Sequence, residues 1–184
     1  MSVEISFIVD TMLGGIARWL RMLGYDTLYY NDLEDWKIIN IAARDNRVII
    51  TRDRGLYVKC IKNDLKCLLL EEESIENRLA QISREYGIRL YVDLEKSRCP
   101  VCNGELTKVS KELVIGRVPQ RVYERSNDFW ICKSCGKVYW IGRHWRGIED
   151  TLKRAREISS MYSKRSSGGS VVEETRSPKR TEVK

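Results

Sequence analysis

Residues 5–24 read ISFIVDTMLGGIARWLRMLG, and this stretch decides the fold. The apolar run at residues 5–9 contains β-branched and aromatic side chains and ends at Asp10, which predicts a buried strand. Residues 11–15 turn the chain. From Ile16 the apolar residues recur at helical spacing until Gly24, where the helix is expected to end. The stretch therefore predicts a strand, a turn and a helix, with a carboxylate at the end of the strand.

The same alternation of strand and helix continues as far as residue 86. Further strands are predicted over residues 27–30, 47–51 and 67–70, and further helices over residues 34–45, 55–61 and 75–86. Alternating strands and helices form a mostly parallel sheet with helices on its faces, and sites on such sheets lie at the carboxyl ends of the strands. The predicted fold class is therefore α/β, with a mostly parallel sheet flanked by helices.

Two cysteine couplets, Cys99-Pro100-Val101-Cys102 and Cys132-Lys133-Ser134-Cys135, predict a zinc site. Each couplet folds into a tight turn that directs both sulfurs at one ion, so four thiolates complete a tetrahedral shell. Such a shell has no open position for water, so the zinc is expected to be structural. Short strands predicted over residues 112–117, 122–124 and 138–141 surround the couplets, as in a small zinc ribbon.

The chain is predicted to consist of three parts: a sheet domain at residues 1–93, a zinc ribbon at residues 94–150, and a basic tail at residues 151–184. The tail is expected to be helical over residues 151–162 and disordered beyond them. The formal net charge is +7, and the basic excess belongs to the ribbon and the tail. This distribution suits a polyanionic partner, although a solvated basic surface explains it equally well.

The composition also bears on localisation and on cysteine chemistry. No apolar run approaches the roughly 20 residues of a membrane span, and no amino-terminal apolar run suits export. Zinc couplets favour a reducing compartment, so we expect a cytoplasmic protein with no membrane partner. Cys60 and Cys67 lie among apolar residues and are interpreted as buried thiols.

Three carboxylates occupy positions that the predicted sheet would bring together. Asp10 ends the first strand, Asp53 follows the third, and Asp35 lies in the first turn of the helix that enters the third strand. Asp32 is a candidate fourth member. Because like charges repel unless a cation neutralises them, the cluster predicts a catalytic Mg²⁺ or Mn²⁺. The alternative is that these residues are caps and turn residues.

Basic and aromatic side chains supply candidate nucleic-acid contacts. Near the acidic positions they are Arg18, Arg21, Arg52 and Arg54, and in the ribbon they are Arg121, Tyr123 and Arg125. The first four arginines can fork onto phosphate oxygens, or they can pair with the neighbouring carboxylates. Trp130 and Trp140 are interpreted as ribbon core residues. His144, the only histidine, is expected to make a structural hydrogen bond.

Several motifs together resemble the Mut-seven C-terminal RNase family. They are residues 10–21, DTMLGGIARWLR; Asn31-Asp32 with Asp35; Thr51-Arg52-Asp53-Arg54-Gly55-Leu56; and the segment from Cys99 to Trp145. The resemblance implies a PIN-like nuclease domain followed by a zinc ribbon, with Asp10, Asp35 and Asp53 as the metal-binding acids. PIN nucleases commonly have a further acid between the first two of these positions. Here that stretch offers only Asp26 and Asp32, and Asp32 is the chosen candidate.

Two functions follow as hypotheses. The first is a metal-dependent ribonuclease that hydrolyses RNA phosphodiester bonds, in which the zinc ribbon aids binding of single-stranded or structured RNA. The alternative is a non-catalytic RNA-binding adaptor, acting with the ribosome or a processing complex, whose acidic site is vestigial. A thiol redox protein is a weak third reading, since redox couplets normally occur singly.

Overall fold

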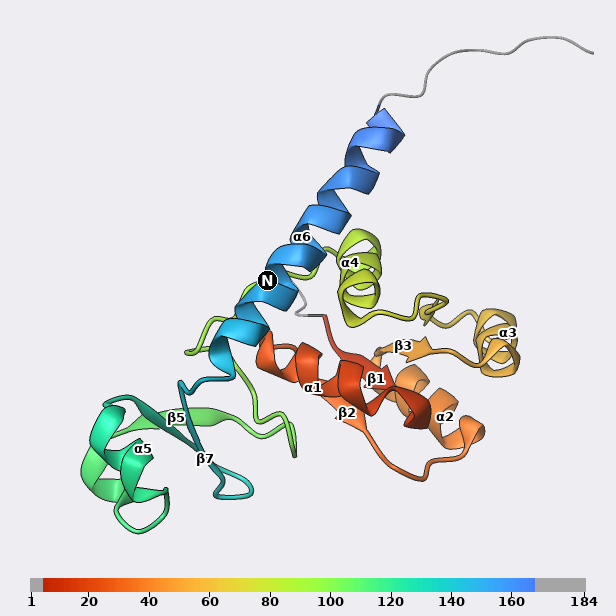
Figure 1. Cartoon of the computed structure of the whole chain (residues 1–184). Coiled ribbons are helices and arrows are strands. Elements are labelled where there is room, and N and C mark those ends of the chain that lie inside the picture. Colours follow the sequence, from red (N-terminus) through yellow and green to blue (C-terminus); the bar gives the residue numbers. More distant parts are fainter. Residues whose placement is uncertain (1–4, 168–184) are drawn as a thin grey trace, which may run out of the picture.

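The computed structural model describes residues 5–167, with side chains described as far as residue 162 (Figure 1). Its first part is a four-stranded sheet in the order β2-β1-β3-β4. The strands are β1 (Phe7–Val9), β2 (Thr27–Tyr29), β3 (Val48–Thr51) and β4 (Cys67–Leu69). All three strand pairs are parallel. The predicted parallel α/β sheet is therefore confirmed.

Four helices cover this sheet: α1 (Gly14–Met22), α2 (Asp35–Asp45), α3 (Arg54–Lys62) and α4 (Ile75–Tyr86). Side chains alternate across the sheet, so Phe7 and Val9 join the core on the side of α1 and α4. Ile8 faces the opposite side and joins the core formed by α2 and α3, which includes Cys60. Burial on both faces explains why β1 and β3 are continuous apolar runs.

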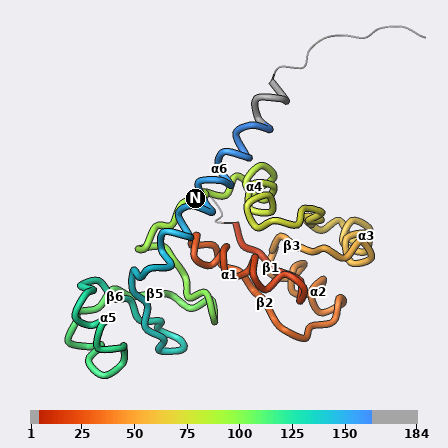
Figure 2. Tube along the Cα trace, in the orientation of Figure 1, coloured from red at the N-terminus to blue at the C-terminus, as the bar shows by residue number. Residues whose placement is uncertain are grey.

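A second, antiparallel sheet in the order β5-β6-β7 follows in the chain (Figure 2). Its strands are β5 (Leu106–Val109), β6 (Phe129–Cys132) and β7 (Val138–Trp140). The connection from β5 to β6 contains a 3₁₀ helix, η2 (Lys111–Val114), and the short helix α5 (Gln120–Arg125). The second cysteine couplet begins at Cys132, the last residue of β6, and continues into the loop that leads to β7, as the ribbon prediction requires.

Two of the three strands predicted in the ribbon are wrong. Residues 112–117 form the end of η2 and a turn at Gly116, whose φ is +71°. Residues 122–124 lie in α5, which follows Pro119 and contains the good helix formers Gln120, Arg121, Glu124 and Arg125. The prediction over 138–141 matches β7, whereas β5 and β6 were missed.

The helix α6 (Trp145–Ser167) connects the ribbon with the parallel sheet, and it runs beside α4 (Figure 1). Leu152 and Ala155 on α6 are buried in the core of the first sheet, and Arg154 pairs with Glu76 on α4 at 3.0 Å. The helix was predicted to begin at residue 151, but it begins at Trp145. The disorder predicted beyond residue 162 is wrong for residues 163–167, which continue α6. Residues 168–184 lie outside the described part, and the domain boundaries stay predictions.

Within the described part of the chain, no helix combines the length and the apolar character that crossing a membrane requires. The expected cytoplasmic location stays a prediction.

Candidate functional site

The carboxyl ends of β1 and β3 lie side by side and hold two of the predicted acids. Val9 is paired with Ile50 in the parallel register, and the Asp10 amide donates to the Ile50 carbonyl at 2.9 Å. Asp10 therefore begins the chain segment that leaves the sheet beside the end of β3. Asp53 follows β3 by two residues, so both residues leave the sheet at one edge, as the sequence predicts.

Asp10 is a buried carboxylate whose hydrogen-bond partners among the described residues are both hydroxyl groups. Its side chain is 6% exposed. Oδ2 accepts a hydrogen bond from Thr51 Oγ1 at 2.8 Å, and Oδ1 accepts one from Thr11 Oγ1 at 3.2 Å. No Lys, Arg or His in the described part pairs with it. A buried charge without a counter-ion is costly, so this carboxylate is suited to a cation.

Thr51 links Asp10 to Asp53 through its hydroxyl group. While it donates to Asp10, the same Oγ1 accepts a hydrogen bond from the Asp53 amide at 2.9 Å. Asp53 Oδ1 then caps α3 by accepting from the amides of Gly55 at 2.5 Å and Leu56 at 3.1 Å. The capping interpretation is thus confirmed for one oxygen of Asp53, and Oδ2 makes no hydrogen bond within the described residues.

Asp35 opens α2 and forms an ion pair with a lysine that sequence reasoning missed. Its Oδ2 accepts from Lys59 Nζ on α3 at 2.8 Å, and the two side chains are 38% and 57% exposed. The hydrogen bond and the charge of Asp35 raise the pKa of the Lys59 ammonium, and Asp53 contributes further. Lys59 therefore lies within electrostatic range of both acids.

Asp32 occupies the loop between β2 and α2, on the wall of a cavity of about 530 Å³. Arg18, Tyr29 and Tyr30 share this wall with Asp32, and Pro100 from the first cysteine couplet closes it. The four predicted acids do not form a compact group of metal ligands in the structure. Among the described residues, the only such group of three or more is made by the cysteines. Whether Asp10, Asp35, Asp53 and Asp32 share a metal ion stays a prediction.

The predicted phosphate-binding arginines differ in their surroundings. Arg18 and Arg52 are exposed, and Arg54 forms an exposed ion pair with Glu71 at 2.8 Å. Arg21 instead is 4% exposed, and burial lowers the pKa of its guanidinium. The helical spacing that grouped Arg21 with Arg18 was misleading, because the first cysteine couplet covers that part of α1.

The guanidinium of Arg21 connects α1 to the zinc ribbon. It donates to the Thr27 carbonyl at 2.9 Å and to the carbonyls of Pro100 and Val101 at 3.1 and 3.0 Å. Asn103 adds a second connection, because its Oδ1 accepts from the Thr27 amide at 3.0 Å and its Nδ2 donates to Asp26 Oδ1 at 2.6 Å. These contacts attach the first couplet to β2 and α1.

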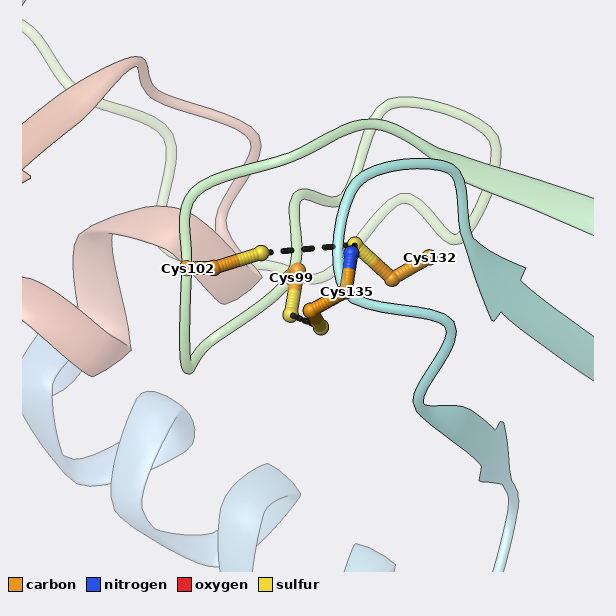
Figure 3. Close-up of side chains that lie close together, drawn as sticks. All are labelled: Cys99, Cys102, Cys132 and Cys135. Atoms are coloured by element: carbon orange, nitrogen blue, oxygen red, sulfur yellow. Dashed lines mark hydrogen bonds between the residues drawn. The ribbon is translucent and has the colours of Figure 1, made fainter.

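The four cysteines point toward one another from two loops (Figure 3). Their sulfurs all lie within 4.8 Å of one another, with Cys99 and Cys135 at 3.7 Å and Cys102 and Cys132 at 3.4 Å. Zn–S bonds of about 2.3 Å place the sulfurs of a tetrahedral site roughly 3.8 Å apart, so the cluster fits a zinc ion. All four are free thiols, and no disulfide competes with this role.

Tyr139 supports the cluster from β7. Its hydroxyl lies 3.0 Å from Cys99 Sγ. Burial opposes ionisation of Cys99, but hydrogen bonds from Tyr139 and from the backbone outweigh this effect and lower the pKa of the thiol to about 7. A thiol that ionises near neutral pH is well suited to metal binding.

The aromatic side chains and the histidine of the ribbon have different roles. Trp130 is 6% exposed, which confirms the core interpretation, whereas Trp140 is only half-buried. Tyr123 is half-buried on α5, with Lys111 Nζ 4.9 Å from its ring centroid. The His144 side chain is exposed and makes no hydrogen bond within the described residues, so the expected structural hydrogen bond is not formed.

Comparison with known proteins identifies the family of this architecture. The family described as the Mut7-C RNAse domain matches residues 5–152, which include the sheet edge and the four cysteines. Searches of the curated proteins and of the solved structures found no match.

Proposed function

Because the chain belongs to the Mut7-C RNase domain family, we propose that it is a metal-dependent ribonuclease whose active site lies at the carboxyl edge of the parallel sheet. The family assignment implies a ribonuclease and an RNA substrate. What we propose in addition is that cleavage depends on a metal ion and that the acidic residues at this edge form the site. The observation that supports them best is the buried Asp10 carboxylate, which no cationic side chain of the described residues neutralises.

Asp10, Asp35 and Asp53, helped by Asp32, would hold Mg²⁺ or Mn²⁺, because carboxylate oxygens are the ligands these hard cations prefer. The bound ion would supply stabilisation of the phosphodiester charge and a water of lowered pKa. Thr51 positions the acids, since its hydroxyl fixes Asp10 Oδ2 and the Asp53 backbone together. The exposed guanidinium groups of Arg18 and Arg52 would bind the RNA backbone near this edge.

The test uses purified protein and a labelled single-stranded RNA with Mn²⁺. We expect Asp10→Asn and Asp53→Asn each to lower the cleavage rate by at least about 100-fold, because metal stabilisation contributes several kcal/mol to the transition state. Asp64→Asn is the matched control, since Asp64 is an exposed aspartate after α3 and is not part of the proposed site. Wild-type rates in the Asp10 and Asp53 variants would refute the site.

A second candidate function is an RNA-binding adaptor. Two of the predicted metal ligands already have partners within the protein, which favours this function. Asp35 pairs with Lys59, and Asp53 caps α3. RNA binding by the purified protein without any divalent-dependent cleavage would support this function and exclude the nuclease.

A further inference from the structure

A cavity of about 450 Å³ lies in the ribbon, between α5 and the segment that leads from β7 to α6. Arg121 and Arg125 of α5 line one wall, and Trp140 and Arg143 line the other. Figure 1 shows α5 and β7 on the opposite side of the molecule from α2 and α3. The cavity is therefore separate from the acidic edge of the parallel sheet.

The cavity carries an uncompensated positive charge. Arg121, Arg125 and Arg143 are exposed, and no acidic side chain lines the cavity. None of the three guanidinium groups forms an ion pair or a hydrogen bond with another described residue. Another arginine of the ribbon does so, since Arg117 donates to the Gly136 carbonyl at 2.6 Å. Three free guanidinium groups around one hollow favour an anion with several oxygen acceptors, and phosphate suits their fork geometry.

Trp140 gives this basic cavity an aromatic wall. The indole is half-buried and lies between this cavity and a smaller apolar one that Trp145 and Ile148 also line. A Cβ atom at position 142 would lie 3.2 Å from Trp140 Nε1, so Gly142 allows the backbone to pass close to the edge of the ring. A half-buried indole held by such packing is preorganised for stacking.

We propose that this cavity binds one nucleotide of a single-stranded RNA, with its base stacked on Trp140 and the flanking phosphates bound by Arg121, Arg125 and Arg143. Only unpaired bases offer a face to an aromatic side chain, which is why the strand is single. The inference rests on the proposed function in one respect, that the substrate is RNA. Since the cavity is remote from the acidic edge, it tethers long substrates and leaves short ones unaffected.

Binding is measured with a fluorescent oligouridylate of about 30 nucleotides, full-length protein and no added divalent ion. We expect Trp140→Leu and the double variant Arg121→Gln/Arg125→Gln each to weaken binding about tenfold, and Trp140→Phe to retain most of it. The arginine variant should also flatten the dependence of log Kd on log salt by about 1.4, for two lost phosphate contacts. Duplex RNA should show no dependence on Trp140.

The matched control is Lys137→Gln/Arg146→Gln, which removes the same charge from exposed ribbon and α6 positions that do not line the cavity. Zinc content and thermal unfolding show whether each variant is folded. If Trp140→Leu does not fold, the double variant Arg121→Gln/Arg125→Gln still tests the proposal, because both arginines are exposed. Equal loss in the control and cavity variants would overturn the proposal. If Trp140→Leu weakens binding of a polyglutamate peptide but leaves RNA binding unchanged, the proposal is overturned and the cavity is a site for an acidic protein segment.

Cleavage assays separate this inference from the nuclease proposal. With Mn²⁺, the cavity variants should raise KM for the long RNA and leave kcat, and all rates on an RNA of about five nucleotides, unchanged. A wild-type protein that never cleaves RNA but binds it through the cavity would refute the nuclease and retain this inference. If the protein cleaves RNA in an Asp10-dependent manner and the cavity variants have no effect, the nuclease proposal is retained and this inference is refuted.

Discussion

At the scale of single residues, the site depends on contacts between distant parts of the chain. Asp10 was predicted from its place after an apolar strand, and its burial agrees with a role beyond a local turn. Thr51 appeared in the sequence only as part of a motif, although its hydroxyl joins two of the acids. Lys59 gave no sequence signal, because its partner Asp35 lies on another helix. Pairs of this kind follow from tertiary packing and have no local pattern.

The ion pair between Lys59 and Asp35 leads to a prediction about metal affinity. If Asp35 binds the catalytic ion, Lys59 competes with it for the same carboxylate oxygen. We expect Lys59→Gln to lower the Mn²⁺ concentration for half-maximal cleavage by no more than a few-fold, because solvent screens an exposed ion pair. Lys62→Gln, one turn further on the same helix, serves as the control. An unchanged or higher Mn²⁺ requirement in Lys59→Gln would argue against Asp35 as a ligand.

Arg21 allows a second prediction at this scale, on stability. Replacing it by Met removes three hydrogen bonds. The carbonyls of Thr27, Pro100 and Val101 then lose the guanidinium donor. We expect Arg21→Met to lower the free energy of unfolding by about 2–3 kcal/mol, measured from urea transitions. Arg18→Met on the exposed face of the same helix should change it by less than about 0.5 kcal/mol. Similar values for the two variants would contradict the structural role of Arg21.

At the scale of elements, the sequence predicted the regular part of the fold better than the ribbon. Each strand and helix of residues 5–86 has its own apolar periodicity, because both faces of the parallel sheet are covered. In the ribbon, β5 has two exposed residues, Thr107 and Lys108, between two half-buried ones, so no buried apolar run marks it in the sequence. The run Phe129-Trp130-Ile131 did carry a strand signal for β6, since aromatic and β-branched residues favour strands.

Asp26, which directly precedes β2, should make the free energy of unfolding depend on pH in the acid range. Partial burial raises the pKa of Asp26, but hydrogen bonds from Arg47 and Asn103 outweigh it and hold that pKa below its usual value. Ionised Asp26 therefore stabilises the fold above its unfolded pKa of about 4, and this contribution disappears as the pH falls through the lower folded value. We expect Asp26→Asn to be less stable at neutral pH, by about 1–2 kcal/mol.

The difference between wild type and Asp26→Asn should shrink as the pH falls from about 5 to about 3, in chemical unfolding followed at each pH. Asp64→Asn is the control and should follow the wild type throughout. A difference between wild type and Asp26→Asn that is constant with pH would show that the carboxylate charge is not what stabilises this region.

At the scale of the whole molecule, the four-cysteine cluster is attached to the parallel sheet. The first couplet is fixed to α1 and β2 by Arg21 and Asn103, and α6 connects the ribbon back to α4. The four-cysteine cluster and the ribbon were predictable because ligand spacing is local. The attachment was not, because Arg21 and Pro100 are 79 residues apart in the chain.

Zinc removal should therefore affect more than the ribbon. After chelation we expect faster amide hydrogen exchange in β5, β6 and β7, and also in β2, while β1 and β3 keep their protection. Exchange measured by mass spectrometry checks this, and restoring zinc should restore protection. Chelation that leaves exchange in β2 unchanged would show that the couplet does not stabilise the sheet edge.

The contacts of Arg21 also bear on how such a gene can change over time. A chain shortened to its first half would expose Arg21 and would lose two of the three carbonyls that accept from its guanidinium, those of Pro100 and Val101. Recombination that exchanged one half for an unrelated module would meet the same penalty. We therefore expect the two halves to be inherited together, with the arginine as the residue that resists their separation.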